Sequence, residues 1–129
     1  MKNVVHGIRA GEFFALMCDG TRDIAGLEQM IVCFRTVDDN FNIEEDFVGM
    51  YNLYDGTAET IFQALQDVLL RYNLDKNKMR GQSYDGAANM AGHLSGAAQR
   101  FLDAVPEAIF VHCYAHKLNL VLQDLCKGV

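Results

Sequence analysis

The sequence predicts an α/β domain, a mixed five-stranded sheet with flanking helices, in the order βββαβαβα. Two observations lead to this prediction. Three strand-like segments come first and are joined by short connections, which favours an antiparallel meander. Helix-like and strand-like segments then alternate, as in sheets whose later strands are joined by helices. The 129 residues, 50% of them hydrophobic, suit one domain, to which we assign residues 1–129.

The three strands of the predicted meander differ in their pattern. Residues 12–19, EFFALMCD, form an apolar run that ends on Asp19, as a strand buried on both faces would. Residues 27–38 alternate between two faces, one of which carries Met30, Val32 and Phe34. Residues 40–55 contain a third strand, with one face formed by Phe47, Gly49 and Tyr51.

The pattern then changes to a helical period. Thr57 can serve as an N-cap, and Asn73 is a plausible left-handed stop. The apolar residues between them recur at helical spacing: Ile61, Leu65, Val68, Leu69 and Tyr72. This segment therefore predicts an amphipathic helix.

Two strand-then-helix units complete the prediction. Residues 79–85 form a short strand that ends on Asp85, and the small residues of 86–105 form a helix that Pro106 ends. Residues 108–115 read as the fifth strand, and residues 116–129 begin an amphipathic helix. The apolar stripe of that helix consists of Leu118, Val121, Leu122 and Leu125.

Charge and composition restrict the function. A net charge of -6 argues against binding of a nucleic acid phosphate backbone by this chain alone. Any action on DNA would need a basic surface that these residues do not supply. The sequence carries no signal peptide and no run long enough to span a membrane, so we expect a soluble intracellular protein. Reduced thiols are the expected state of its four cysteines, Cys18, Cys33, Cys113 and Cys126.

Two aspartates are the sharpest candidates for chemistry. Asp19 and Asp85 each end a predicted strand, and neighbouring parallel strands would bring them together at their carboxyl ends. Such hard oxygen ligands suit Mg²⁺ or Mn²⁺, which clamp the oxygens of a phosphodiester during displacement. Both residues also precede glycine, and Asp-Gly is a common turn. The residues alone leave the metal site and the turn open.

Two further groups have weaker signals. Cys113 and His116 form C-x-x-H, which offers half a zinc site or a thiol and imidazole pair, although a buried cysteine and a helix-start histidine are the commoner outcome. Thr21 and Asp23 have the chemistry to bind metal or substrate, but a turn is favoured there.

Three separated segments, in order, resemble one family. They are CDGTRDIAGLEQMIVCFRTVDDNFNIEEDFVGMYNL, RGQSYDGAANMAGHLSGAAQRF and AIFVHCYAHKLNLVL. In spacing and order they are similar to the hAT superfamily of DNA transposases, specifically the transposase-derived domain of zinc finger MYM-type and THAP-containing proteins. The resemblance runs from about Gly11 to Leu125.

This resemblance implies an RNase H-like fold in which the first strand lies beside the fourth. It implies that Asp19 and Asp85 are the first two members of a DDE triad that binds Mg²⁺ or Mn²⁺. The family's C-x-x-H motif falls on Cys113 and His116, with the histidine near the active site and the DNA. Asp23 matches the second acid of D-x-x-x-D, to which we assign no catalytic role. A nuclear location is also implied.

The sequence departs from the family pattern in two ways. Gly20 stands where an acid is usual, and Arg22 where a small hydroxyl residue is common. The third acid, a glutamate, lies in the family beyond a helical insertion, and residues 1–129 reach neither it nor the upstream zinc finger. We therefore expect a domain truncated before the insertion and the last catalytic helix, with metal positioning and DNA capture in doubt.

Three functions remain open. The first is a fragment of a hAT-type transposase or its domesticated derivative, inactive alone in DNA cleavage and strand transfer. The second is a domesticated module for dimerisation or for protein partners in transcriptional regulation, because an uncovered sheet face would favour a homodimer. The third, least favoured, is a small α/β enzyme that uses His112, His116 or Cys113.

Overall fold

A mixed five-stranded sheet forms the body of the protein in the computed structural model, which describes residues 13–22, 24–87, 90, 92 and 95–128. The elements are β1 Phe14–Arg22, β2 Glu28–Val37, β3 Ile43–Asn52, α2 Ala58–Arg71, the 3₁₀ turn η1 Lys76–Lys78, β4 Met79–Tyr84, α4 Ala97–Ala104, β5 Ile109–His112 and α5 Tyr114–Lys127. Apart from the short turn, this is the predicted order βββαβαβα. The α/β fold class is confirmed.

The strand order is β3-β2-β1-β4-β5. The first three strands are antiparallel neighbours, whereas β4 lies parallel to both β1 and β5. The first and fourth strands are therefore adjacent, as the resemblance implies. Their pairing ends where Met17 faces Ser83, although β1 continues alongside β2 as far as Arg22.

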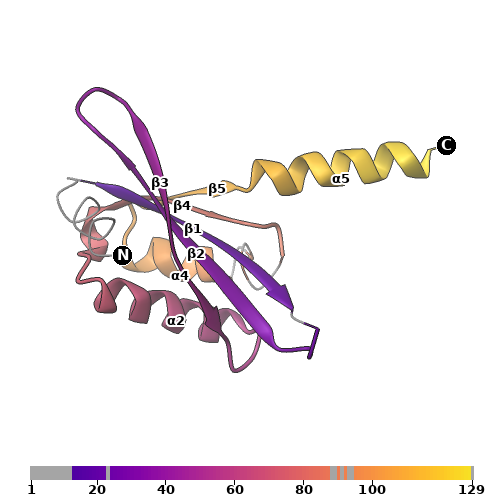
Figure 1. Ribbon diagram of the computed structural model, residues 1–129, viewed down its shortest axis with the longest axis horizontal. Coiled ribbons are helices and arrows are strands. Elements are labelled where there is room, and N and C mark those ends of the chain that lie inside the picture. Colours follow the sequence, from indigo (N-terminus) through magenta and orange to yellow (C-terminus); the bar gives the residue numbers. More distant parts are fainter. Residues whose placement is uncertain (1–12, 23, 88–89, 91, 93–94, 129) are drawn as a thin grey trace.

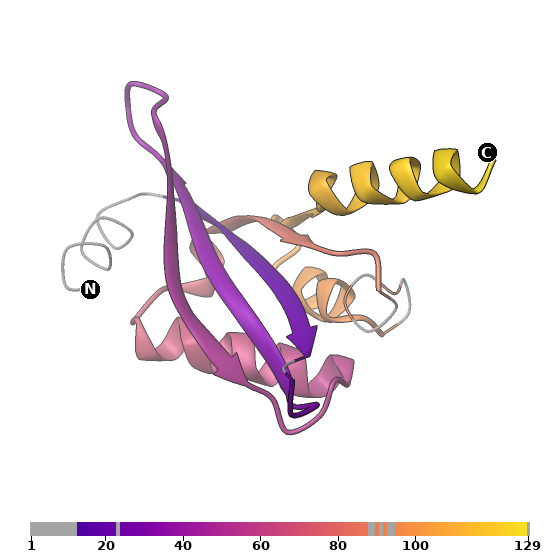
Figure 2. The same cartoon turned by 45° about the vertical axis from the view of Figure 1, so that its right-hand side comes forward.

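Two helices cover one face of this sheet. Figures 1 and 2 show α2 and α4 on the same side, while α5 extends away from the sheet edge. The core between sheet and helices takes alternate residues of the strands, as the pattern of β2 predicts. Its largest fully buried aromatic side chains are Tyr84, Phe34 and Phe101. The Phe101 ring meets Phe62 of α2 edge-on at 4.8 Å, which joins the two helices.

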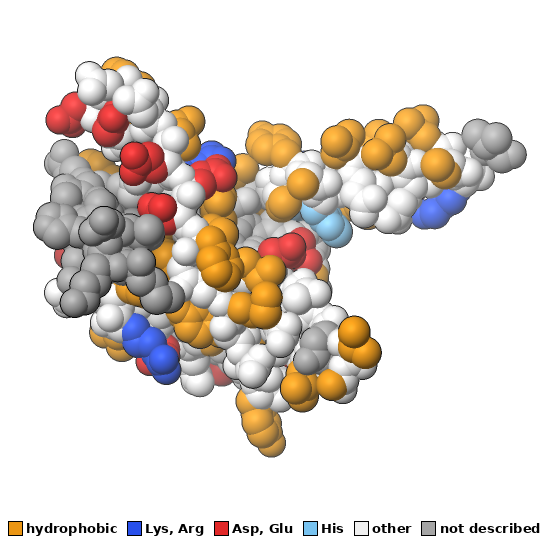
Figure 3. All heavy atoms as spheres, in the orientation of Figure 1, with side chains coloured by type: hydrophobic (Ala, Val, Ile, Leu, Met, Phe, Trp, Pro, Cys, Tyr) orange, Lys and Arg blue, Asp and Glu red, His pale blue; other side chains and the backbone are white. Residues whose placement is uncertain are grey.

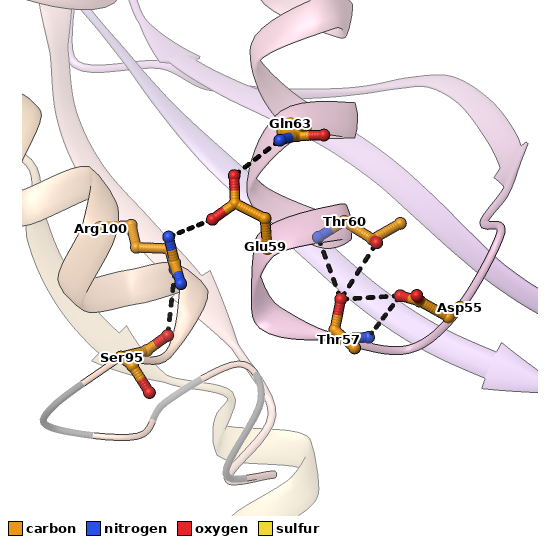
Figure 4. A network of polar contacts seen from close by, with 7 residues as sticks. All are labelled: Asp55, Thr57, Glu59, Thr60, Gln63, Ser95 and Arg100. Carbon is orange, nitrogen blue, oxygen red and sulfur yellow. Dashed lines mark hydrogen bonds and ion pairs between the residues drawn. The ribbon is translucent and has the colours of Figure 1, made fainter.

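Helix α2 begins and ends as the sequence predicts. The Thr57 hydroxyl accepts a hydrogen bond from the backbone N–H of Thr60, and Asn73 has the left-handed φ of 51°. Figure 4 shows the polar contacts around this start. In the same view Glu59 of α2 pairs with Arg100 of α4, whose Nε also donates to the Ser95 carbonyl at 3.1 Å. The Glu59–Arg100 ion pair links α4 to α2.

The predicted face of β3 is wrong at one residue. Phe47 pairs with Cys33 but Gly49 with Val32, so Val48 is the extra residue of a β-bulge. The bulge turns Phe47 away from the face that carries Gly49 and Tyr51, and Val48 itself is buried. The Tyr72 hydroxyl donates to the Val48 carbonyl oxygen at 2.9 Å, which anchors the bulge to the end of α2.

The later elements differ from prediction in length and burial. In the described part of 86–105, α4 begins only at Ala97, while β5 stops at His112 and α5 already begins at Tyr114. A parallel edge strand with one neighbour ends where its ladder ends, which shortens β5. The expected apolar stripe on α5 is present, but the helix buries none of its residues.

Candidate functional site

The two candidate aspartates lie at matching positions on β1 and β4. The last parallel pair is Met17 opposite Ser83, and Asp19 and Asp85 each follow two residues later. The prediction that the first strand ends at Asp19 is wrong, because Asp19 still faces Ile31 in the β1–β2 ladder. The sheet instead divides here: β1 stays with β2 while β4 ends. The carboxylates therefore flank the point where the two strands separate.

The two candidate carboxylates affect the pKa of the buried Cys18 thiol. Burial raises the pKa of the Cys18 thiol far above its usual 9.0, and the negative charges of Asp19 and then Asp85 raise this pKa further. Both negative charges therefore disfavour the thiolate form of Cys18.

The turn interpretation applies to one aspartate and not to the other. An Asp85 carboxylate oxygen accepts a hydrogen bond of 3.1 Å from the backbone N–H of Ala87, so Asp85 does open a turn. Asp19 and Thr21 lie inside β1, so the favoured turn at Thr21 is wrong. Asp19 is exposed and Asp85 half-buried, which leaves carboxylate oxygens open to solvent.

The side chains of His112 and His116 lie near the turn that follows Asp85. The backbone N–H of Cys113 donates to the Tyr84 carbonyl at 2.9 Å, which holds the start of α5 beside β4. A methyl group on Gly86 would lie 3.8 Å from Nε2 of His116 and 3.9 Å from Nδ1 of His112. Figure 3 shows acidic side chains next to a histidine below the start of α5. His116 thus lies next to the Asp85 turn.

His112 is the site residue that the sequence reasoning undervalued. Its ring contacts Phe110 edge-on at 4.8 Å, and Phe110 in turn stacks on Tyr84 at 6.0 Å. The available signal was its place at the end of the fifth strand, in the H-C-Y-A-H segment that also contains His116.

Other candidates do not join this cluster. Cys113 is the half-buried N-cap of α5, and its side chain makes no capping hydrogen bond. Asp23 lies outside the described residues. Within the described part of the chain, no group of three or more His, Cys, Asp or Glu side chains is arranged to hold a metal ion. The cysteines described there are free thiols, as expected.

The donor chemistry of the aspartate pair fits a divalent cation. Mg²⁺ prefers oxygen ligands and often binds through only one or two carboxylates, keeping waters and substrate phosphates as its other ligands. Asp19 and Asp85 supply two such carboxylates. The imidazoles are softer donors that suit transition metals better. The pair is thus suited to Mg²⁺ or Mn²⁺ as part of a ligand set.

A mixed sheet of the order β3-β2-β1-β4-β5, with acids just beyond the last β1–β4 pair, is consistent with an RNase-like domain. Residues 1–96 match the family model DUF4371, described as the ZMYM1/FAM200 RNase-like domain, and the chain belongs to this family. It is also similar to the 52 kDa repressor of the inhibitor of the protein kinase of Homo sapiens, with 30% identity over 116 residues, and of Mus musculus, with 31% over 113 residues.

These alignments cover 89% and 87% of this chain but only 15% of each relative. The chain therefore spans about 15% of the length of the curated relatives it matches. It is a transposase-derived RNase-like domain, related to a domesticated repressor-type protein. Among the described residues, no helix has the length and apolar character to cross a membrane.

Proposed function

We propose that this chain supplies the first two acidic ligands of a divalent metal site for DNA cleavage and strand transfer in a hAT-type transposase or its derivative. The observation that carries this proposal is that Asp19 and Asp85 each lie two residues beyond the Met17–Ser83 pair, where the parallel strands β1 and β4 separate. Open α/β sheets place their sites at this edge. The resemblance to hAT transposases supports the same two residues.

The roles of the residues follow from their chemistry. Asp19 and Asp85 would hold Mg²⁺ or Mn²⁺, which when bound stabilises charge on the oxygens of a phosphodiester. The backbone N–H of Ala87 fixes one oxygen of Asp85 and so orients this carboxylate. His116 and His112 flank Gly86, so their imidazoles would lie beside a phosphodiester bound at this edge.

DNA capture would depend on a longer protein. The net charge of -6 makes this chain unfavourable to a polyanion, so basic surface from another part of the protein would supply the affinity. The third acidic ligand would likewise come from outside residues 1–129. In this view the domain acts in the nucleus and is inactive in strand transfer by itself.

Mn²⁺ binding tests the proposal directly. Electron paramagnetic resonance of free Mn²⁺, titrated with the chain, should reveal one weak site that Asp19→Asn and Asp85→Asn each abolish. Asp39→Asn is the matched control, because Asp39 is an exposed carboxylate in the β2–β3 turn. Its affinity should equal that of the unaltered chain. Binding that survives both site substitutions would refute the proposal.

A second candidate function is a domesticated interaction module without catalysis. The observation that favours it is the exposure of large apolar side chains on α5 and on the sheet, including Leu118 and Phe47. This candidate expects self-association or partner binding that does not change when Asp19 and Asp85 are both replaced by asparagine.

A further inference from the structure

The sheet has one face that no helix of the described chain covers. Helices α2 and α4 pack on the other face, and the strand register places a set of side chains outward. Five of the exposed outward apolar residues are Ile43, Phe47, Met50, Ile109 and Val111. Figure 3 shows hydrophobic side chains over the strands. We call this set the outer sheet face. The parallel part of a sheet usually has both faces covered, and Ile109 and Val111 lie on that part, so this face calls for a partner.

The second unpartnered surface is on α5. Most of its exposed large apolar residues, all but Leu120, fall within one stripe at helical spacing, formed by Tyr114, Leu118, Val121, Leu122 and Leu125. Leu118 and Leu125 are 61% and 63% exposed. Such a stripe in a soluble helix normally contacts another element.

The stripe does not meet the outer sheet face of its own chain. Only Cys113 separates β5 from α5, whereas a strand-to-helix connection within one unit usually has two to six residues. Figures 1 and 2 both show α5 running away from the sheet. Two apolar surfaces of one chain are thus held apart by its own connectivity.

We propose that two copies of this chain form a symmetric dimer, in which α5 of each copy packs across the outer sheet face of the other. The length of α5 matches the width of the sheet that it would cover. Fourteen residues of helix measure about 21 Å, and five strands span about 19 Å from β3 to β5. The helix is long enough to cover the face from edge to edge.

The buried area also agrees with a stable dimer. An apolar side chain of this size removes on the order of 80 Å² from water when it is covered. Ten of them in each copy, in two equivalent contacts, remove roughly 1,600 Å², the size of a standard specific interface. The two-fold arrangement uses the same pair of surfaces twice, so it closes without leaving either surface exposed.

Sedimentation equilibrium across a concentration series tests the dimer. The double variant Leu118→Glu/Leu125→Glu and the sheet variant Phe47→Glu should each weaken dimerisation at least about 100-fold. Leu120→Glu is the matched control, because Leu120 is 45% exposed on the same helix but outside the stripe. Its dissociation constant should stay within about threefold of that of the unaltered chain. All the altered residues are exposed, and circular dichroism checks that each variant folds.

Mixing separates this arrangement from other dimers. A Phe47→Glu chain has an intact α5, and a Leu118→Glu/Leu125→Glu chain has an intact outer sheet face, so the two should form a heterodimer that keeps one of the two contacts. Native mass spectrometry with one chain isotope-labelled detects it. An unaltered chain that stays monomeric at about 100 μM, an unaffected Phe47→Glu dimer, or a mixture without heterodimer each overturns the proposal. None of these outcomes depends on metal binding at Asp19 and Asp85.

Discussion

The backbone N–H of Cys113 donates a 2.9 Å hydrogen bond to the carbonyl oxygen of Tyr84. This bond extends the β4–β5 ladder one residue past its last pair, Tyr84 opposite His112. It fixes the first turn of α5 beside Asp85 and brings His116 to Gly86. A site that combines residues from β1, β4 and α5 therefore depends on the short strand β5.

We expect folded-state stability to fall above pH 9 because of Cys18. The pKa of this buried thiol is raised in the folded state, so the unfolded chain loses the proton first as the pH passes 9.0. The stabilisation is fully present below that pH. Above pH 9.0 this stabilisation decreases by up to about 1.4 kcal/mol for each pH unit. Urea unfolding between pH 8 and 10 measures the slope, with pH values set around the usual thiol pKa.

The matched variants for this slope are Cys18→Ala and Cys126→Ala. Cys18→Ala should make the alkaline slope shallower, whereas Cys126 is exposed and its removal should leave the slope unchanged. The same protection should keep Cys18 unalkylated in the folded chain while Cys126 reacts. Equal slopes for the two variants would contradict the explanation.

Tyr72→Phe should loosen the bulge of β3. It removes the hydrogen bond from the Tyr72 hydroxyl to the Val48 carbonyl and should lower the unfolding free energy by about 1 kcal/mol. Burial, and after it the hydrogen bond to Tyr72, raises the pKa of Tyr51 to about 12. The substitution should therefore move this pKa towards 10.0, which tyrosinate absorbance measures. Tyr54→Phe, at a side chain that is 98% exposed, is the control and should change neither quantity.

Gln82 joins β4 to two carbonyl groups in the core. Its Nε2 donates to the carbonyl oxygens of Ala98 and Ala108, at 3.0 and 2.9 Å. Gln82→Met keeps the volume but removes both hydrogen bonds, so we expect a loss of about 1–3 kcal/mol in chemical unfolding. Gln63→Met on the exposed face of α2 should cost no more than about 0.5 kcal/mol. A similar loss for both variants would show that the side-chain swap itself is responsible.

The ion pair between Glu59 and Arg100 should contribute little and depend on salt. Both side chains are partly exposed, so a double-mutant cycle of Glu59→Gln and Arg100→Met should give a coupling of about 0.2–1 kcal/mol. In about 1 M salt the coupling should shrink, because the screening length falls to about 3 Å. A coupling that is unchanged by salt would point to packing instead of charge.

The elements that sequence patterns predicted well are those governed by local physics. Thr57 caps α2 and Asn73 ends its last turn, since capping and left-handed backbone depend on neighbouring residues. Met30, Val32 and Phe34 are all fully buried, as their alternation on β2 indicates. Asp85 opens its turn for the same local reason.

The predictions that were wrong concern features set by contacts between segments far apart in the sequence. Val48 becomes a bulge only because β3 must keep pairing with β2 while Tyr72 of α2 binds its carbonyl. Asp19 stays inside β1 because β2 continues to pair with it after β4 has ended. The length of a strand depends on its neighbours, and its own sequence does not contain that information.

The sequence by itself determined the βββαβαβα order, the core face of β2, the start and end of α2 and the two aspartates as candidates, because period, capping and turn chemistry are local properties. The tertiary structure alone decided that Asp19 and Asp85 each lie two residues beyond the last β1–β4 pair, that His112 joins His116 beside Gly86, and that α5 leaves its apolar stripe uncovered. These features arise from the pairing of segments far apart in the chain, which only the folded backbone specifies.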